Sequence, residues 1–355
     1  SISQEILRAI EKGNEYLKSK QNPEGYWAQP SYPALTALAV TAYMRDPANQ
    51  GKPLPEYIRK GYDFILKSQK EDGSIFNRGM SSYNTAVCMM ALLAANKEEY
   101  APAILKGRAY LIKQQNHFAP DNPYNGGIGY GDKQAPPIAD LSNTSLALEA
   151  IYYSQKLAKD GKYGEQPDLD WNAATEFINR CQQNPAVNKE PWVSNDKSQL
   201  GGFVYRPGVS SARDKKAAAF DKAEPPKAYG SMTYAGMQSL IYANVDKNDP
   251  RVKLALKWLE NSYSLDENPG MGVQGLYYYY QAMSKALSAM GIDTLTLENG
   301  RKVDWRDELA NKLISIQKSD GSWVNTNNRW WEADPVLVTS YCVLALEQLY
   351  HSIPR

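Results

Sequence analysis

Two aspartates at predicted helix starts are candidates for acid–base catalysis. Asp140 and Asp334 each precede an apolar stretch that predicts a helix, so each carboxylate is placed to cap a helix N-terminus. If the two faced each other, they would form an acid–base pair. Asp334 is followed by Pro335, a sequence that is typical of a simple cap. Both interpretations stay open: Asp140 and Asp334 as catalytic residues, and both as structural caps.

Residues that bind metals or form covalent intermediates are sparse. The chain has two histidines, His117 and His351, and three widely separated cysteines without a CxxC pair. This argues against a histidine-dependent triad or a multi-histidine metal site, and it predicts buried, inert thiols. Neither Gly126-Gly127 nor Gly201-Gly202 has the sequence context of a phosphate-binding loop. We therefore expect no metal and no cofactor.

Aromatic residues are the other chemical resource of the chain, with 25 Tyr against 6 Phe. A tyrosine has an apolar body and a polar tip, so this excess indicates a wet aromatic cavity, many helix contacts, or both. Of the four successive tyrosines Tyr277–Tyr280, at most two can face the inside of a barrel. Those rings either stabilise a cation or pack between helices. Trp330 and Trp331 either stack on a ligand or fix the turn before the last helix.

The overall composition limits the classes of partner. Of the residues, 43% are hydrophobic and 22% are charged, which is typical of a folded globular protein. The formal net charge is +1, so no bulk electrostatic attraction to nucleic acid is expected. No apolar run is long enough to predict a transmembrane segment. Ser1 begins no recognisable secretory signal, and a cytoplasmic location and a periplasmic or secreted one after signal removal both remain open.

Two kinds of helical stretch alternate along the chain, and their contrast predicts an outer and an inner layer. A helix with one polar face lies outside, whereas one that is apolar nearly all round lies inside. The expected outer helices are 2–20, 54–69, 101–115, 168–183, 249–263 and 303–317. The expected inner helices are 33–45, 82–96, 140–157, 230–244, 274–290 and 334–350.

Six outer–inner pairs are enough to close a ring. We therefore expect an all-α fold, an (α/α)6 toroid, formed by residues 1–355 as a single domain. Long loops are expected at 116–139 and 184–229, and loops of this length are usually functional or disordered. We expect the first loop to be ordered over the cavity mouth and residues 208–225 to be partly mobile.

The N-termini of the inner helices would converge on one rim of the ring. Unpaired N–H groups and partial positive charge would gather there, able to bind an anion or a polar head group, while the bore takes an apolar body. Besides the two aspartates, the ligand-binding candidates at this rim and in the bore are Arg78, Tyr83, Asn84, Ser142, Asn143, Arg206, Ser231, Tyr234, Gln274, Tyr277, Tyr278, Trp330 and Trp331.

One repeated turn gives a family resemblance. Gln21-Asn22-Pro23-Glu24-Gly25-Tyr26-Trp27 recurs at 317–323, and a partial copy with Ile in place of Trp lies at 69–75. These turns resemble the QW repeats of squalene-hopene cyclases and other class II terpene cyclases. The segments 81–86, 126–131 and 140–144 also look like those of protein prenyltransferase β subunits. The resemblance implies an (α/α)6 barrel with an aromatic-lined central cavity.

Few of the catalytic residues of these families have a match in this sequence. Class II cyclases protonate their substrate with an Asp-x-Asp-Asp motif, and the best match is Asp140-Leu141-Ser142-Asn143, in which Ser142 replaces the proton donor. Neither a serine nor an amide is acidic enough to protonate an alkene, so standard cyclisation is not expected. The zinc ligands of the prenyltransferases are missing as well, which argues against a zinc-dependent prenyltransferase.

Three functional hypotheses follow. The first is a divergent cyclase-like enzyme that binds a small apolar or amphipathic, isoprenoid-like ligand in the bore, with Asp140 or Asp334 as a weak acid or base. The second is a non-catalytic binding or scaffold protein on the same fold. The third is a carbohydrate-active toroid, since closed α/α barrels also carry glycan chemistry.

Overall fold

The computed structural model describes residues 1–131, 138–212 and 225–354, and helices dominate them. The elements are α1 (Ile2–Ser19), α2 (Pro33–Arg45), η1 (Pro47–Asn49), α3 (Glu56–Lys67), α4 (Ser81–Ala95), η2 (Glu98–Tyr100), α5 (Ala101–Gln114), α6 (Leu141–Tyr153), α7 (Gln155–Lys159), α8 (Trp171–Asn179), α9 (Gly230–Tyr242), α10 (Pro250–Asn261), α11 (Leu276–Ala289), β1 (Thr294–Thr296), β2 (Lys302–Asp304), α12 (Trp305–Ile316), η3 (Arg329–Trp331) and α13 (Pro335–Ser352).

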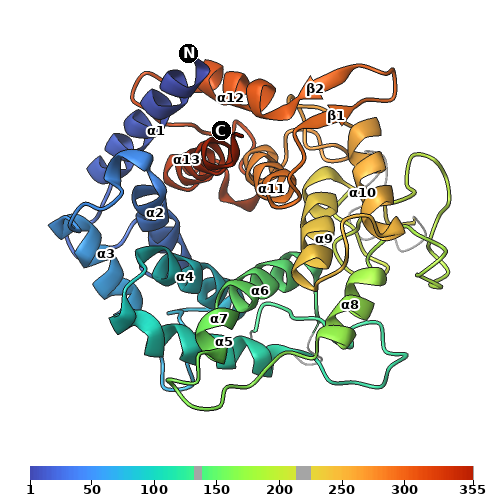
Figure 1. Cartoon of the computed structure of the whole chain (residues 1–355), viewed down its shortest axis with the longest axis horizontal. Helices are drawn as coiled ribbons and strands as arrows, with labels where there is room; N and C mark the ends of the chain where they lie inside the picture. Colours follow the sequence, from blue (N-terminus) through green and yellow to red (C-terminus); the bar gives the residue numbers. More distant parts are fainter. Residues whose placement is uncertain (132–137, 213–224, 355) are drawn as a thin grey trace.

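The helices form two concentric rings (Figure 1). The inner ring consists of α2, α4, α6, α9, α11 and α13, each in contact with the next, and α13 returns to contact α2. The outer ring consists of α1, α3, α5, α8, α10 and α12. Since α1 packs against both α12 and α13, the first helix closes the ring with the last two. The predicted all-α toroid is confirmed.

Burial follows the predicted contrast between the layers. On α1, Ile6, Ile10 and Leu17 are buried on one face. On α13, by contrast, almost every residue from Val336 to Leu349 is buried. An outer helix therefore contributes one apolar stripe, whereas an inner helix packs against neighbours on most of its circumference.

Two predicted helices differ from those observed. The stretch predicted as 140–157 breaks at Ser154, where α6 ends and the short α7 begins, and the hydroxyl of Ser154 bonds back to Ala150 O at 2.7 Å. The stretch predicted as 168–183 forms only α8, which begins after its cap Asp170 and ends as Arg180 leads into the turn at Gln182. Of the expectations about the long loops, those for 132–137 and 213–224 lie outside the described residues.

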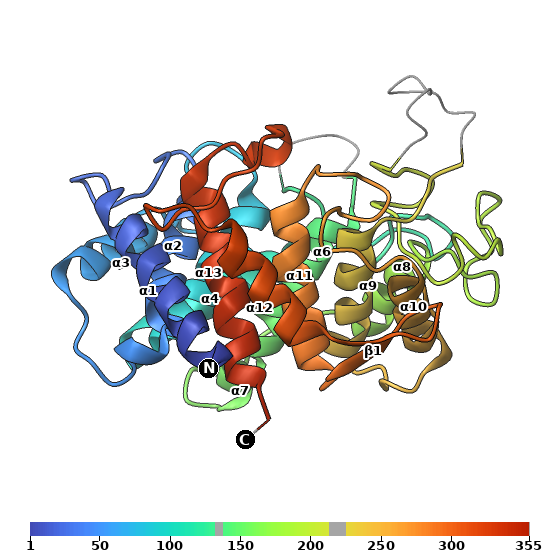
Figure 2. The ribbon, with the colours of Figure 1, turned by 90° about the horizontal axis from the view of Figure 1, so that it is seen from above.

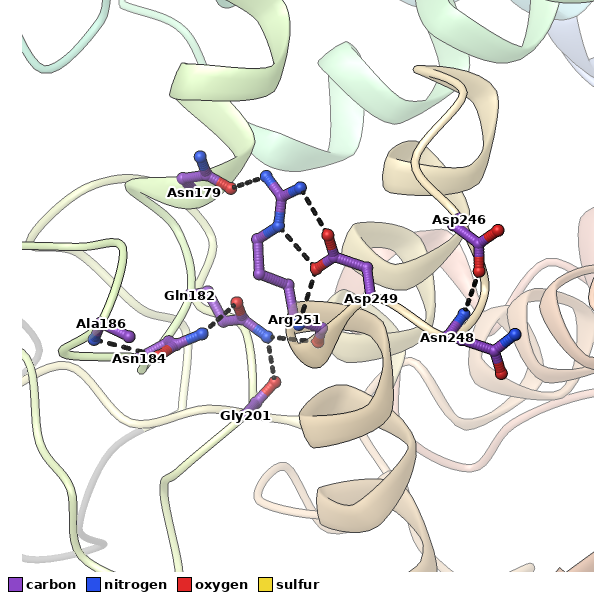
Figure 3. Close-up of polar contacts among 9 residues, drawn as sticks. All are labelled: Asn179, Gln182, Asn184, Ala186, Gly201, Asp246, Asn248, Asp249 and Arg251. Carbon is purple, nitrogen blue, oxygen red and sulfur yellow. Dashed lines mark hydrogen bonds and ion pairs between the residues drawn. The ribbon is translucent and has the colours of Figure 1, made fainter.

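A recurring glutamine ties neighbouring outer helices together. Gln69 follows α3, and its Nε2 donates to Gly73 O at 3.1 Å and to Ala103 O of α5 at 2.9 Å. Gln182, after α8, bonds in the same way to Gly201 O and to Arg251 O of α10 (Figure 3). The same pair of bonds occurs at Gln21, Gln115 and Gln317.

The glycine in each of these turns is required by geometry. Gly73 has φ of +94°, and a Cβ atom there would lie 2.1 Å from Lys106 O of α5. The backbone therefore approaches the next outer helix more closely than any other residue permits. Gln317 makes the corresponding contact with Ala9 O of α1 at 3.0 Å, so this turn closes the outer ring.

A threonine anchors the other end of each turn. The backbone N–H of Trp27 donates to Thr36 Oγ1 at 2.9 Å, and the equivalent bonds join Ile75 to Thr85, Ile128 to Thr144, Phe203 to Thr233 and Trp323 to Thr339. The part of the chain that the structure describes thus contains five copies of the turn. In α11, the inner helix without this threonine, Tyr279 occupies the equivalent position, and its hydroxyl donates to Ser264 O at 2.9 Å.

Figure 2 shows where the two faces of the ring lie. The start of α1 and the end of α13 lie on the face at which the inner helices end, and the described parts of the long connections before α6 and α9 lie toward the opposite face. Among the described residues, no helix is both long and apolar enough to cross a bilayer.

Candidate functional site

A cavity of about 510 Å³ lies at the centre of the inner ring. All six inner helices contribute to its wall. Its apolar lining includes Leu38, Ala86, Val87, Met90, Leu93, Leu146 and Leu344. This size falls within the range of pockets that bind small organic ligands.

The cavity-lining residues form three tiers. Each tier is defined by how many residues its members lie after the anchoring threonine of their inner helix, or after Tyr279 in α11. The deep tier, about two residues on, contains Leu38, Val87, Leu146, Gln281 and Tyr341. The middle tier, about five or six residues on, contains Thr41, Met90, Glu149, Gln238, Lys285 and Leu344. The mouth tier, about nine residues on, contains Arg45, Ala94, Tyr153, Tyr242, Ser288 and Gln348.

Three tyrosines form the floor of the cavity. Tyr83, Tyr278 and Tyr341 line its deepest part, and the rings of Tyr278 and Tyr341 meet edge-on with centroids 5.9 Å apart. Burial raises the pKa of Tyr83 to about 12, and it also raises the pKa values of Tyr278 and Tyr341. These hydroxyls are therefore neutral donors, and their rings present electron-rich surfaces to whatever occupies the cavity.

The middle tier carries an ion pair. Lys285 Nζ of α11 lies 2.7 Å from Glu149 Oε2 of α6, and both side chains are largely buried. The hydroxyl of Tyr242 donates to the same carboxylate oxygen at 3.1 Å, and Gln238 Nε2 donates to Tyr242 Oη at 2.5 Å. This network joins α6, α9 and α11 around one side of the cavity.

The mouth lies at the C-terminal ends of the inner helices, not at the N-terminal rim that the sequence suggested. Several of the N–H groups at that rim donate to acceptors within the chain and are not free to bind a ligand. Asn84 Oδ1 accepts from Ala34 N of α2 at 2.9 Å, and Asn268 Oδ1 accepts from Ser231 N of α9 at 3.0 Å. The carbonyl of Tyr130 accepts from Ser82 N of α4 at 3.0 Å.

A buried glutamate accepts hydrogen bonds from the first N–H groups of α11 in the same way. Glu332 is fully buried, and its carboxylate accepts from Tyr277 N at 3.0 Å and Tyr278 N at 3.1 Å at the start of α11. Burial raises the pKa of this carboxyl. The expected anion-binding rim is therefore wrong for these N–H groups, because internal acceptors occupy the donors.

Asp140 is buried beside the floor and does not line the cavity. It caps α6: Oδ1 accepts from Asn143 N at 2.7 Å, and Oδ2 accepts from Asn143 Nδ2 at 2.9 Å. Burial raises its pKa to about 6, although the bonds from Asn143, the charge of Arg206 and a hydrogen bond from Tyr205 all favour the ionised form. Asp140 thus holds a proton far more readily than an exposed aspartate.

Asp334 has a simpler environment. It is half-buried and caps α13, with Oδ1 accepting from Val336 N at 2.9 Å. Since α6 and α13 stand on opposite sides of the inner ring, Asp140 and Asp334 cap opposite helices (Figure 1). The structure therefore places both aspartates as caps and does not bring them together as an acid–base pair.

Of the predicted site residues, Tyr83 and Tyr278 line the cavity. Tyr234 is fully buried against Tyr279. Asn84 accepts a hydrogen bond from the start of α2, and the backbone N–H of Ser231 donates to Asn268. Hydrogen bonding with Ser142 favours the ionised form of Tyr278, but the cost of burial is larger, so its pKa stays raised. Asn143 bonds to Asp140, and Tyr277 packs edge-on against Tyr280.

The remaining candidates lie outside the cavity. Arg78 is exposed, and Arg206 stacks on Tyr205 with its guanidinium 6.0 Å from the ring centre. Gln274 accepts from Arg329 at 2.6 Å, and Arg329 in turn lies over the ring of Trp330. Trp330 and Trp331 are 44% and 41% exposed and both have positive φ, so this turn carries backbone strain.

The sequence did not identify the polar residues of the cavity: Arg45, Glu149, Gln238, Tyr242, Gln281, Lys285 and Gln348. The sequence does contain a pattern that indicates them, because these polar residues interrupt inner helices that are otherwise apolar. Gln281, Lys285 and Ser288 follow one another at helical spacing on a single face of α11. Polar residues on that face point to the bore.

The described residues contain no group of three or more His, Cys, Asp or Glu that is able to hold a metal ion. The three cysteines are buried, and burial raises the pKa of each thiol. Thiolate chemistry is therefore disfavoured at all three.

Comparison with solved structures identifies the fold. The type II terpene cyclase MstE from Scytonema, in complex with its substrate geranylgeranyl dihydroxybenzoate, matches with a TM-score of 0.58 over 99% of both chains. The chain has the terpene cyclase fold. Sequence identity to MstE is 10%, and the apo form of MstE matches with a TM-score of 0.57 and 11% identity.

A protein from Actinoplanes is similar as well. It matches with a TM-score of 0.50 and 14% identity, over 97% of this chain and 99% of its own. No protein-family model matches the chain. At these identities the similarity concerns the fold, and the function has to be argued from the site.

Proposed function

We propose that this protein binds a ligand with an isoprenoid-like apolar body inside the ring of inner helices. The observation that carries the proposal is the cavity of about 510 Å³, with apolar deep walls and a tyrosine floor. Burying apolar surface there is favourable by roughly 25 cal/mol per Å². MstE, which shares the fold, has a substrate with a geranylgeranyl chain, and this supports the same ligand class.

The shape of the cavity suits an elongated ligand. Tyr83 at the floor and Ala94 at the mouth lie on the same helix, α4, and both line the cavity. At a rise of 1.5 Å per residue, the eleven steps between them make the cavity about 16 Å deep. A linear apolar chain would lie along this axis with its end against the tyrosines.

Turnover is a second candidate activity, and Asp140 is the observation that favours it. Its carboxyl holds a proton up to a pH of about 6. Against turnover, Asp140 does not line the cavity, and Ser142 and Asn143 stand where the family acid motif has aspartates. Binding therefore ranks ahead of catalysis, as in the non-catalytic hypothesis.

The carbohydrate hypothesis has weaker support. A sugar presents hydroxyl groups along its whole length, and the deep tier offers them Leu38, Val87 and Leu146. Hydroxyls without hydrogen-bonding partners in such an environment are unfavourable. The deep part adds only Gln281 and the hydroxyls of the floor tyrosines, whereas the charged residues of the cavity lie in the middle and mouth tiers.

The test is a calorimetric titration of the purified protein with geraniol, farnesol and geranylgeraniol, together with mass-spectrometric analysis of the incubated mixtures. Binding of at least one alcohol without a new product supports a binding protein. A new cyclic or hydrated product would support the enzyme instead. If none of the alcohols binds, the proposal is wrong.

A further inference from the structure

The mouth tier of the cavity differs in chemistry from the deep tier. Arg45 of α2, Gln348 of α13 and Ser288 of α11 lie on three consecutive helices of the inner ring at one level. Across from them stand Tyr153 and Tyr242, whose rings meet with centroids 5.8 Å apart. An amphipathic ligand that places its apolar end on the tyrosine floor would bring its other end to this tier.

Two of the mouth residues have unused hydrogen-bonding capacity. Among the described residues, no hydrogen bond or ion pair engages the guanidinium of Arg45 or the side-chain amide of Gln348. Both side chains are half-buried and line the cavity. An arginine can present two parallel N–H donors to one group of oxygen atoms.

The charges around the cavity leave Arg45 uncompensated. The charged lining residues are Arg45, Lys285 and Glu149, and the last two pair with each other. Glu347 forms no ion pair with Arg45 and is fully buried; burial, and to a smaller extent the charge of Asp46, raise the pKa of its carboxyl, which favours the neutral form. His351, also at the mouth, bonds through Nε2 to the backbone carbonyl of Arg45 and leaves the guanidinium free.

The C-terminal ends of the inner helices disfavour an anion at the mouth. All six inner helices end near the mouth, and their C-termini carry partial negative charge that favours cations. Arg45 lies in the last turn of α2 and offsets this charge at that helix end. An anion in direct contact with the guanidinium gains a charged hydrogen bond, which exceeds the diffuse repulsion from the helix ends.

We propose that the mouth tier binds an anionic head group, a carboxylate or a phosphate, through Arg45 and Gln348. This inference rests on the proposed function and specifies its ligand: an amphipathic molecule with an apolar chain on the tyrosine floor and a single acidic group at the mouth. The rings of Tyr153 and Tyr242 flank the same level from the far wall.

The experiment compares ligands that share one chain. Farnesol, farnesoic acid and farnesyl monophosphate are titrated into wild-type protein, Arg45→Gln and Gln348→Leu. The control is Arg59→Gln, which removes an exposed arginine of α3 outside the cavity. We expect at least one acidic ligand to bind wild type roughly tenfold or more tightly than farnesol, and Arg45→Gln to remove that advantage by weakening the acid far more than farnesol. Arg59→Gln should retain the wild-type affinities for all three ligands. Which of the two acids binds more tightly identifies the head group.

Three results would overturn the inference. Equal affinity of wild type for the alcohol and both acids would show that the mouth does not select an anion, while the proposed apolar cavity would stand. An equal loss of affinity for all three ligands in Arg45→Gln would show that Arg45 only maintains the helix end. If no ligand binds to wild type, the proposed function fails along with the inference.

Discussion

Lys285 Nζ lies 2.7 Å from Glu149 Oε2, so an ion pair connects two inner helices, α11 and α6, that are not neighbours in the ring. The helix between them, α9, adds the hydroxyl of Tyr242 to the same carboxylate. Three of the six inner helices thus share one polar network on the wall of an otherwise apolar cavity.

This network predicts a strong response to removal of one partner. Lys285→Met leaves the largely buried Glu149 carboxylate without its cation, and we expect a loss of about 3 kcal/mol in unfolding free energy. The double variant Lys285→Met/Glu149→Leu should regain most of that loss, because no unpaired charge remains. Denaturation in guanidinium chloride measures both.

The matched control for this network is an exposed pair. Lys312 Nζ lies 2.8 Å from Asp266 Oδ1 at the surface. Lys312→Met should change the unfolding free energy by less than about 1 kcal/mol. A similar loss from both lysine substitutions would mean that the cavity pair behaves as a solvated surface contact.

The glutamine turns predict position-dependent effects of alanine substitution. Gly73→Ala introduces a Cβ atom 2.1 Å from Lys106 O at φ of +94°, whereas Gly51→Ala at φ of +74° meets nothing within 4 Å. Both variants carry the left-handed backbone penalty of about 1–2 kcal/mol. Only Gly73→Ala should lose clearly more than that in unfolding free energy, because the turn must move away from α5. Equal losses would contradict the close approach.

Asp140 predicts a specific dependence of stability on pH. Burial raises its pKa to about 6 from an ordinary value of 3.8, so the folded state binds the proton more tightly than the unfolded state does. As the pH rises from about 4 to 6, the stability contributed by this group is progressively lost, by up to roughly 3 kcal/mol, and it changes no further above that.

The measurement compares wild type with Asp140→Asn at several pH values. An asparagine can still cap α6 but cannot ionise, so the unfolding free energy of wild type should fall relative to that of the variant between pH 4 and 6. Other titrating groups contribute equally to both proteins. A difference that stays constant across this range would show that Asp140 is not buried as described.

The fold was predictable from the sequence because its repeated unit is local. Gln21, Gly25 and Trp27 lie within seven residues of one another, and each has a separate physical task in the turn. The remaining copies are expected from the sequence only as degenerate turns with long insertions, because the glycine that Gln115 or Gln182 contacts, Gly126 or Gly201, lies eleven or nineteen residues further on.

The candidate site was predictable only in part. Of the predicted ligand-binding residues, Tyr83 and Tyr278 lie at inner-helix starts and line the cavity floor, and their contact with a ligand stays a prediction. The sequence predicts a binding rim at the inner-helix starts, whereas the cavity lining reaches exposed residues such as Tyr153 and His351 at the inner-helix ends. The sequence predicts only that the first N–H groups of a helix lack partners within that helix. It does not predict acceptors such as Glu332, which lies 54 or 55 residues away along the chain from the donors that it binds.

The measurement that tests the central claim most directly is ligand binding with the cavity mouth blocked. Ala94→Trp places a large side chain at the half-buried mouth tier, and Ala119→Trp places the same side chain on an exposed loop outside the cavity. If the cavity is the binding site, wild type and Ala119→Trp bind a farnesyl ligand equally, and Ala94→Trp, with an unchanged circular dichroism spectrum, loses at least tenfold in affinity. Equal binding by all three proteins would contradict the account.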